Sequence, residues 1–146
     1  MEVIIPDTNM AAIMPQIILC IGACLVLLMG VFTPKLRKWI GYIAFATCVA
    51  AMISVFTLWR KNYVVFSGML SINYYTNAFC AIILMSSALV CLVTRDDVDE
   101  HKIGEFFSVA LMSTMGMMVM ASSQNLMVIF LGLEIMSVGL YIMIGM

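Results

Sequence analysis

Glu134 lies inside a long apolar segment of the sequence, and it is the residue best placed to do chemistry. A helix that begins at Leu126 would carry Glu134 about 12 Å into a bilayer at 1.5 Å per residue, close to the midplane. An ionised acid at that depth costs about 3 kcal/mol even on lenient insertion scales, so such a residue indicates function by default. Apolar surroundings favour the neutral carboxyl, whereas a nearby cation favours the carboxylate. The expected chemistry is the uptake and release of a proton, or the handling of a cation.

The spacing around Glu134 gives the helix two different faces. Ser137 and Tyr141 follow at i+3 and i+7, which places them on the face of Glu134. The opposite face carries small and flexible residues, namely Gly132, Met136, Gly139 and Met143. We therefore predict a polar stripe that faces a bundle interior or a file of water, and a glycine seam where another helix packs closely. The alternative is that Glu134 only hydrogen-bonds a neighbouring helix and has a structural role.

Other groups of reactive side chains favour packing or solvation over chemistry. Cys20 and Cys24 share a helix face but have no histidine or acidic ligand nearby, so we expect the cysteines to pack as small apolar residues. The acidic loop 95–102 lacks the glycine and the ligand spacing of a calcium loop, and His101 is the only histidine. The 16 methionines are more typical of gap filling than of copper transport. We predict no metal or cofactor site in this chain.

The composition determines the solvent in which these residues act. The chain has 146 residues, of which 64% are hydrophobic and 10% charged. A soluble domain carries about 25% charged residues because it needs a hydrated surface. Seven lysines and arginines form no basic stripe, so nucleic acid is not an expected partner. The sequence predicts an all-α integral membrane protein in contact with the lipid bilayer.

Charged loops, the connection 62–75 and the uncharged polar turn 122–125 divide the chain into five apolar segments, each long enough to span a bilayer. Pro34 ends the first segment, and Asn125 is a suitable N-cap for the last one. The segment 62–75 is rich in β-branched and aromatic residues and is expected to form a hairpin-like connection at the interface. Residues 1–146 thus form a single membrane domain, with helices predicted at 11–32, 39–59, 76–94, 106–121 and 126–146.

The distribution of lysine and arginine predicts the orientation. The loops after the first and third helices hold five basic residues, namely Lys35, Arg37, Lys38, Arg95 and Lys102. The opposite side holds only Arg60 and Lys61. Because basic loops remain in the cytoplasm, we predict that the amino terminus lies outside.

The last two predicted helices resemble a known family. The motif GEF at 104–106, STMGMM at 113–118 and LGLEIMSVGLY at 131–141 are similar to the fourth and fifth helices of subunit N of NADH-quinone oxidoreductase, the respiratory complex I. The match further upstream is looser, and Asn73 stands where relatives usually carry an aspartate.

The resemblance implies more than the residues do by themselves. Family members have about fourteen helices, and the helix-five glutamate, here Glu134, belongs to an antiporter-like proton pathway and pairs with a lysine on a later helix. The chain would then be an N-terminal fragment, or a split subunit completed by another chain. It would work with the other complex I membrane subunits in the bacterial inner membrane. NADH, flavin, iron–sulfur clusters and quinone would bind to partner subunits, so this chain holds no redox active site of its own.

Two further interpretations are compatible with the residues. The motifs are shared with paralogous subunits of multisubunit cation/proton antiporters and of membrane-bound hydrogenases. A small proton-coupled exporter also relies on one membrane glutamate, although usually in its first helix.

Overall fold

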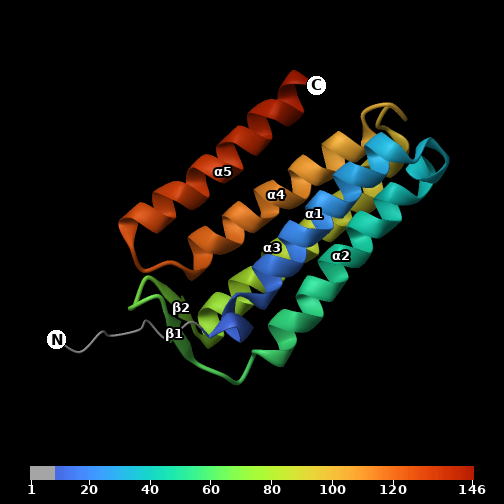
Figure 1. The fold of residues 1–146 in the computed structure, drawn as a ribbon. Coiled ribbons are helices and arrows are strands. Elements are labelled where there is room, and N and C mark those ends of the chain that lie inside the picture. The colour runs from blue at the N-terminus through green and yellow to red at the C-terminus, as the bar shows by residue number, and fades with distance from the viewer. Residues whose placement is uncertain (1–8) are drawn as a thin grey trace.

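The structure is a computed structural model that describes residues 9–146. Within them five long helices run nearly side by side (Figure 1). Their bounds are α1 Met14–Phe32, α2 Arg37–Thr57, α3 Tyr74–Val93, α4 Ile103–Ser122 and α5 Leu126–Gly145. Short 3₁₀ turns precede α1 and α2 and follow α3, at Met10–Ile13, Pro34–Leu36 and Thr94–Asp96. All five helices are long and apolar enough to cross a membrane, so the protein is a multi-pass integral membrane protein.

Helix ends differ from the expected positions by up to three residues, and charged residues account for much of the difference. α2 begins at Arg37 instead of residue 39, and α4 begins at Ile103 instead of residue 106. In both cases the first turn of the helix contains charged residues that the sequence analysis had placed in the loop. Long charged side chains can reach water from a helical backbone, so they mark the membrane boundary better than the helix boundary.

α4 occupies the centre of the bundle and packs against each of the other four helices. Its side chains Phe107, Leu111 and Met118 are fully buried and meet Leu19 of α1 and Leu84 of α3 in one apolar core. α5 lies on the outside of this bundle, where it packs mainly on α4 (Figure 1). Only Gly132 and Gly139 are buried within α5.

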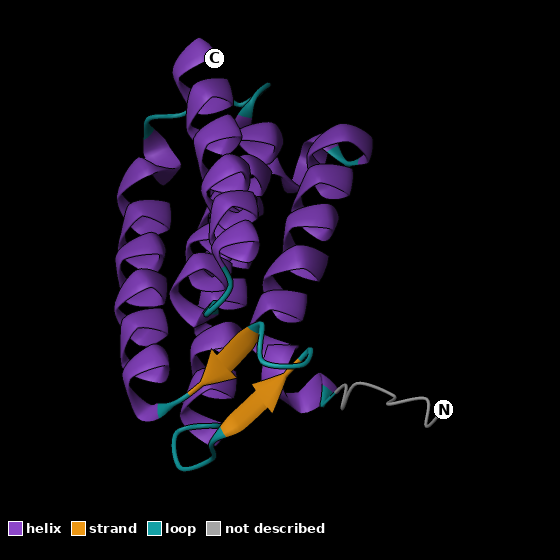
Figure 2. Ribbon diagram, turned by 90° about the vertical axis from the view of Figure 1, so that its left-hand side faces the viewer, coloured by secondary structure: helices purple, strands orange, loops and turns teal. Residues whose placement is uncertain are grey.

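The connection between α2 and α3 is a short antiparallel hairpin. β1 (Tyr63–Val65) pairs with β2 (Leu70–Ile72), and Figure 2 shows the two strands across one end of the bundle. Val65 and Ile72 bury against Ala12 beneath the hairpin. The amide of Gln124 donates to the carbonyl of Met69 at 2.9 Å, which ties the hairpin to the turn between α4 and α5.

Candidate functional site

The start of α5 is fixed by its cap. The side chain of Asn125 accepts a hydrogen bond from the amide of Met127 at 2.9 Å, which satisfies one of the free donors of the first turn. Glu134 follows in the third turn of the helix. The cap and the hairpin contact at Gln124 together set the depth at which α5 carries Glu134.

A seam of small residues sets the rotation of α5. A Cβ atom added to Gly132 would lie 2.9 Å from the carbonyl oxygen of Gly116, and one added to Gly116 would lie 2.9 Å from that of Gly132. Further along, a Cβ on Gly139 would meet the Cβ of Ser113 at 3.0 Å. The Ser113 hydroxyl also donates to the carbonyl of Met136 at 3.4 Å. The two backbones therefore approach closely on this face of α5, as the glycine pattern predicts.

Glu134 lies on the side of α5 that points away from this seam, and it is exposed. It lines a groove of about 390 Å³ whose walls are Val109 and Met112 of α4 and Ile135 and Val138 of α5. Among the residues that line the groove, Glu134 is the only ionisable one. The carboxyl is thus set beside apolar side chains on a surface that the five helices leave open.

Ser137 and Tyr141 share this accessible side of α5. The Ser137 hydroxyl donates to the carbonyl of Leu133 at 2.7 Å, so it is satisfied by its own helix. Tyr141 is 71% exposed. Neither residue lines the groove beside Glu134. The stripe therefore does not face the interior of the five-helix bundle, because the glycine seam occupies the face that packs on α4.

Glu134 has no charged partner among the described residues. In residues 9–146 the single ion pair joins Arg95 to Asp96, outside the apolar region. Within the same residues the structure assigns no hydrogen bond to the Glu134 carboxyl. This arrangement leaves the Glu134 carboxyl accessible to any group that packs on the exposed side of α5.

Two features of the structure are not evident from the sequence. The groove walls Val109 and Met112 carry no chemical signal, since their role depends on how α4 is rotated against α5. Inside the bundle, the hydroxyls of Ser87 and Thr114 lie 2.9 Å apart, and the Cys48 thiol lies 3.7 Å from Ser87. The sequence places these polar residues on three predicted helices, but it does not show that their side chains are in contact.

Proteins of known identity match this chain over most of its length. No protein-family model matches it. The chain is 33% identical over 140 residues to NADH-quinone oxidoreductase subunit N of Trichlorobacter lovleyi, which covers 94% of the chain and 29% of that protein. It is 30% identical to subunit N of Alkalilimnicola ehrlichii over 99% of the chain and 30% of the relative. It is 32% identical to NAD(P)H-quinone oxidoreductase subunit 2 of Acaryochloris marina over 94% of the chain and 27% of the relative.

The chain therefore spans only about 30% of the length of these relatives. The likeness nevertheless extends through all five helices and recurs in proteins of the same name from several organisms. The chain is therefore similar to one part of the longer subunit N proteins of NADH-quinone oxidoreductases.

Proposed function

We propose that this chain is part of a membrane subunit of a proton-pumping NADH-quinone oxidoreductase, and that Glu134 takes up and releases a proton on an antiporter-like pathway. The proposal rests on the position of Glu134, an exposed ionisable side chain that lines an otherwise apolar groove between α4 and α5. An acidic side chain in apolar surroundings within a membrane costs free energy, so its presence there indicates a functional role.

The groove and the stripe have separate roles in this proposal. The apolar walls offer Glu134 no competing charge, so the carboxyl exchanges its proton when a positive charge approaches. That charge, a lysine by resemblance to the family, comes from a segment outside residues 9–146 that packs on the exposed side of α5. Ser137 and Tyr141 support the transfer by offering hydroxyl groups on the same face of the helix.

The remaining assignments follow from the same similarity to subunit N proteins. Other complex I membrane subunits are the partners, together with the bilayer. Electron transfer from NADH to quinone, with flavin and iron–sulfur clusters, takes place in partner subunits. The protein resides in the bacterial inner membrane with its amino terminus outside, because the five basic residues of two loops then lie in the cytoplasm.

The replacement Glu134→Gln in the assembled oxidoreductase tests the proposal. The amide keeps the size and the hydrogen-bonding groups of the side chain but cannot exchange the proton. We expect NADH-driven acidification of inverted membrane vesicles to fall by at least about tenfold, the lower range of effects when a proton-transfer group is removed. The amount of assembled complex should change little, because the amide keeps the size and polarity of the side chain and can still accept a hydrogen bond from the partner lysine.

The matched control is Asp99→Asn, the same acid-to-amide change on an exposed loop residue. It should leave acidification at the wild-type level. Wild-type acidification by Glu134→Gln would rule out a proton-transfer role for this residue.

A further inference from the structure

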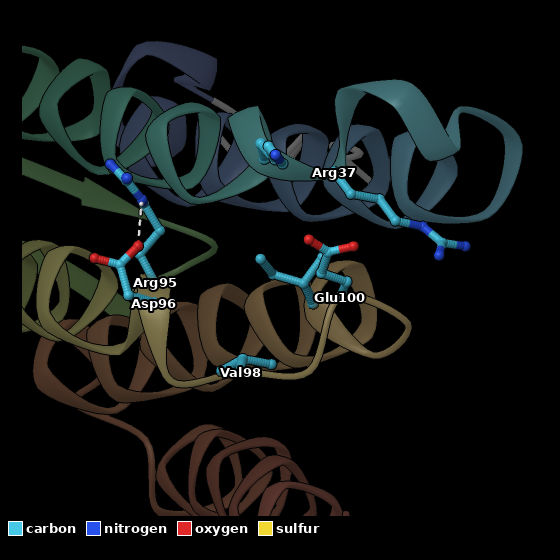
Figure 3. A pocket seen from close by; sticks show the side chains of 7 residues that line it. Arg37, Arg95, Asp96, Val98 and Glu100 are labelled. Atoms are coloured by element: carbon cyan, nitrogen blue, oxygen red, sulfur yellow. Dashed lines mark hydrogen bonds and ion pairs between the residues drawn. The ribbon is translucent and has the colours of Figure 1, made fainter.

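A cavity of about 230 Å³ opens at the end of the bundle where the loops after α1 and α3 lie. Three cations line it, namely Arg37, Lys38 and Arg95. Two carboxylates also line it, but Asp96 is already paired with Arg95 at 3.2 Å. Figure 3 shows this pair and, in the same view, Glu100 between the two arginines. The cavity therefore carries an excess of positive charge.

The start of α2 adds to this positive charge. Arg37 and Lys38 are the first two residues of α2, and its N-cap, Leu36, makes no side-chain hydrogen bond. The first turn of α2 has no acidic residue. The positive end of the helix dipole favours an anion, and cations in that turn are unfavourable unless an anion is bound beside them. An uncapped helix start with two cations is thus suited to an external anion.

The guanidinium of Arg37 has an unused donor as well. Its Nη1 lies 3.1 Å from Nδ1 of His101, which must accept the bond because arginine has no acceptor. Its Nε is buried and has no hydrogen-bond partner among the described residues. An unpaired buried donor is costly, and an anion in the neighbouring cavity would relieve that cost.

Aromatic residues place the cavity at the depth of the lipid headgroups. Trp39 is 60% exposed in the first turn of α2, and Tyr42 is half exposed one turn later. The Arg95 guanidinium sits over the Tyr42 ring, 4.3 Å from its centre. Exposed tryptophan and tyrosine at the end of a spanning helix are typical of the membrane interface.

We propose that this cavity binds the phosphate of an anionic phospholipid. Basic pockets between spanning helices are a recurring form of headgroup site. Arg37 and Lys38 contact the phosphate, and Arg95, held by Tyr42 and Asp96, forms the opposite wall. The acyl chains lie against the exposed apolar side of α2 beside Trp39. Free phosphate offers the same headgroup chemistry without the acyl chains, so the test must separate the two.

The test measures how spin-labelled phosphatidylglycerol associates with the full chain, isolated from its own membrane and reconstituted in phosphatidylcholine bilayers. Spin-labelled phosphatidylcholine serves as the neutral lipid, and excess inorganic phosphate is added in a separate series. The double variant Arg37→Gln/Lys38→Gln should bind phosphatidylglycerol more weakly, by about fivefold for each cation removed. Removing cations from a helix start does not weaken the helix, so the variant should fold.

Two further variants sharpen the test. Arg60→Gln/Lys61→Gln makes the same two changes at the other end of α2 and should leave the affinity unchanged. Glu100→Gln removes a carboxylate from the cavity and should raise the affinity, a gain that misfolding cannot produce. Equal binding by the wild type and Arg37→Gln/Lys38→Gln would overturn the proposal. Complete displacement of the lipid by inorganic phosphate would overturn the assignment to a phospholipid.

Discussion

At the scale of the residue, Glu134 combines two properties that are rarely found together in a membrane protein. It is an acidic side chain deep in a spanning helix, and it is exposed on the surface of the bundle that the chain itself forms. Bare exposure to lipid would cost about 3 kcal/mol for the ionised form. The cost is avoided when the carboxyl carries a proton or when a cation packs against it.

Replacement of Glu134 by leucine separates the proposed role in proton transfer from a role in holding helices together. Glu134→Leu should leave the thermal stability of the isolated chain within about 0.5 kcal/mol of the wild type, as is usual for exposed sites without special contacts. It should still abolish proton transfer in the assembled protein. Circular dichroism in detergent measures the first effect, and vesicle acidification the second. A Glu134→Leu protein that assembles and pumps normally would show that the polar group of this side chain is needed neither for proton transfer nor for assembly.

At the scale of the element, the fold presents Glu134 by packing the opposite side of α5 against α4. Gly116 and Gly132 face each other so closely that a Cβ on either would press on the backbone of the other. The apolar side chains Val109 and Met112 of α4 then form the wall beside the carboxyl. The glycine seam thus controls the rotation of α5, and the rotation controls where Glu134 points.

A larger side chain in the seam should therefore disturb the site without touching it. Gly132→Val should destabilise the α4–α5 pair by about 1–3 kcal/mol, the usual range for overpacking, because backbone atoms cannot move aside as a flexible side chain can. The control is Gly145→Ala, since a Cβ there meets nothing within 4 Å. Thermal unfolding in detergent compares the two variants. Equal midpoints for both variants would mean that the helices are not in close contact at Gly132.

At the scale of the whole molecule, much of the fold could be predicted because charge is scarce. Five apolar segments, separated by charged loops and by the polar turn at 122–125, give five spanning helices, and the described residues contain all five. Asn125 is also the N-cap that its residue type and position indicate. The exact helix starts were missed at Arg37 and Ile103, since charged side chains do not end a helix when they can reach water.

The direction of the polar stripe could be predicted only in part. The pattern places Glu134, Ser137 and Tyr141 opposite the glycines, and the structure agrees. The sequence pattern does not tell which of the two faces of α5 packs on the other four helices. Both faces need a partner, and the partner of the polar face is not evident from these five helices. Contacts such as that between Ser87 and Thr114 depend on the rotation of both α3 and α4, so periodicity alone does not predict them.

The proposed proton transfer requires that the Glu134 carboxyl can carry a proton inside the intact membrane. Dicyclohexylcarbodiimide is apolar and reacts with protonated carboxyls, so it reports this state directly. In wild-type vesicles we expect covalent labelling of Glu134, detected by peptide mass, with a matching loss of acidification. Asp99, an exposed loop residue, should stay unlabelled. Full labelling of Glu134 with unchanged acidification, or no labelling of Glu134, would contradict the proposed proton transfer.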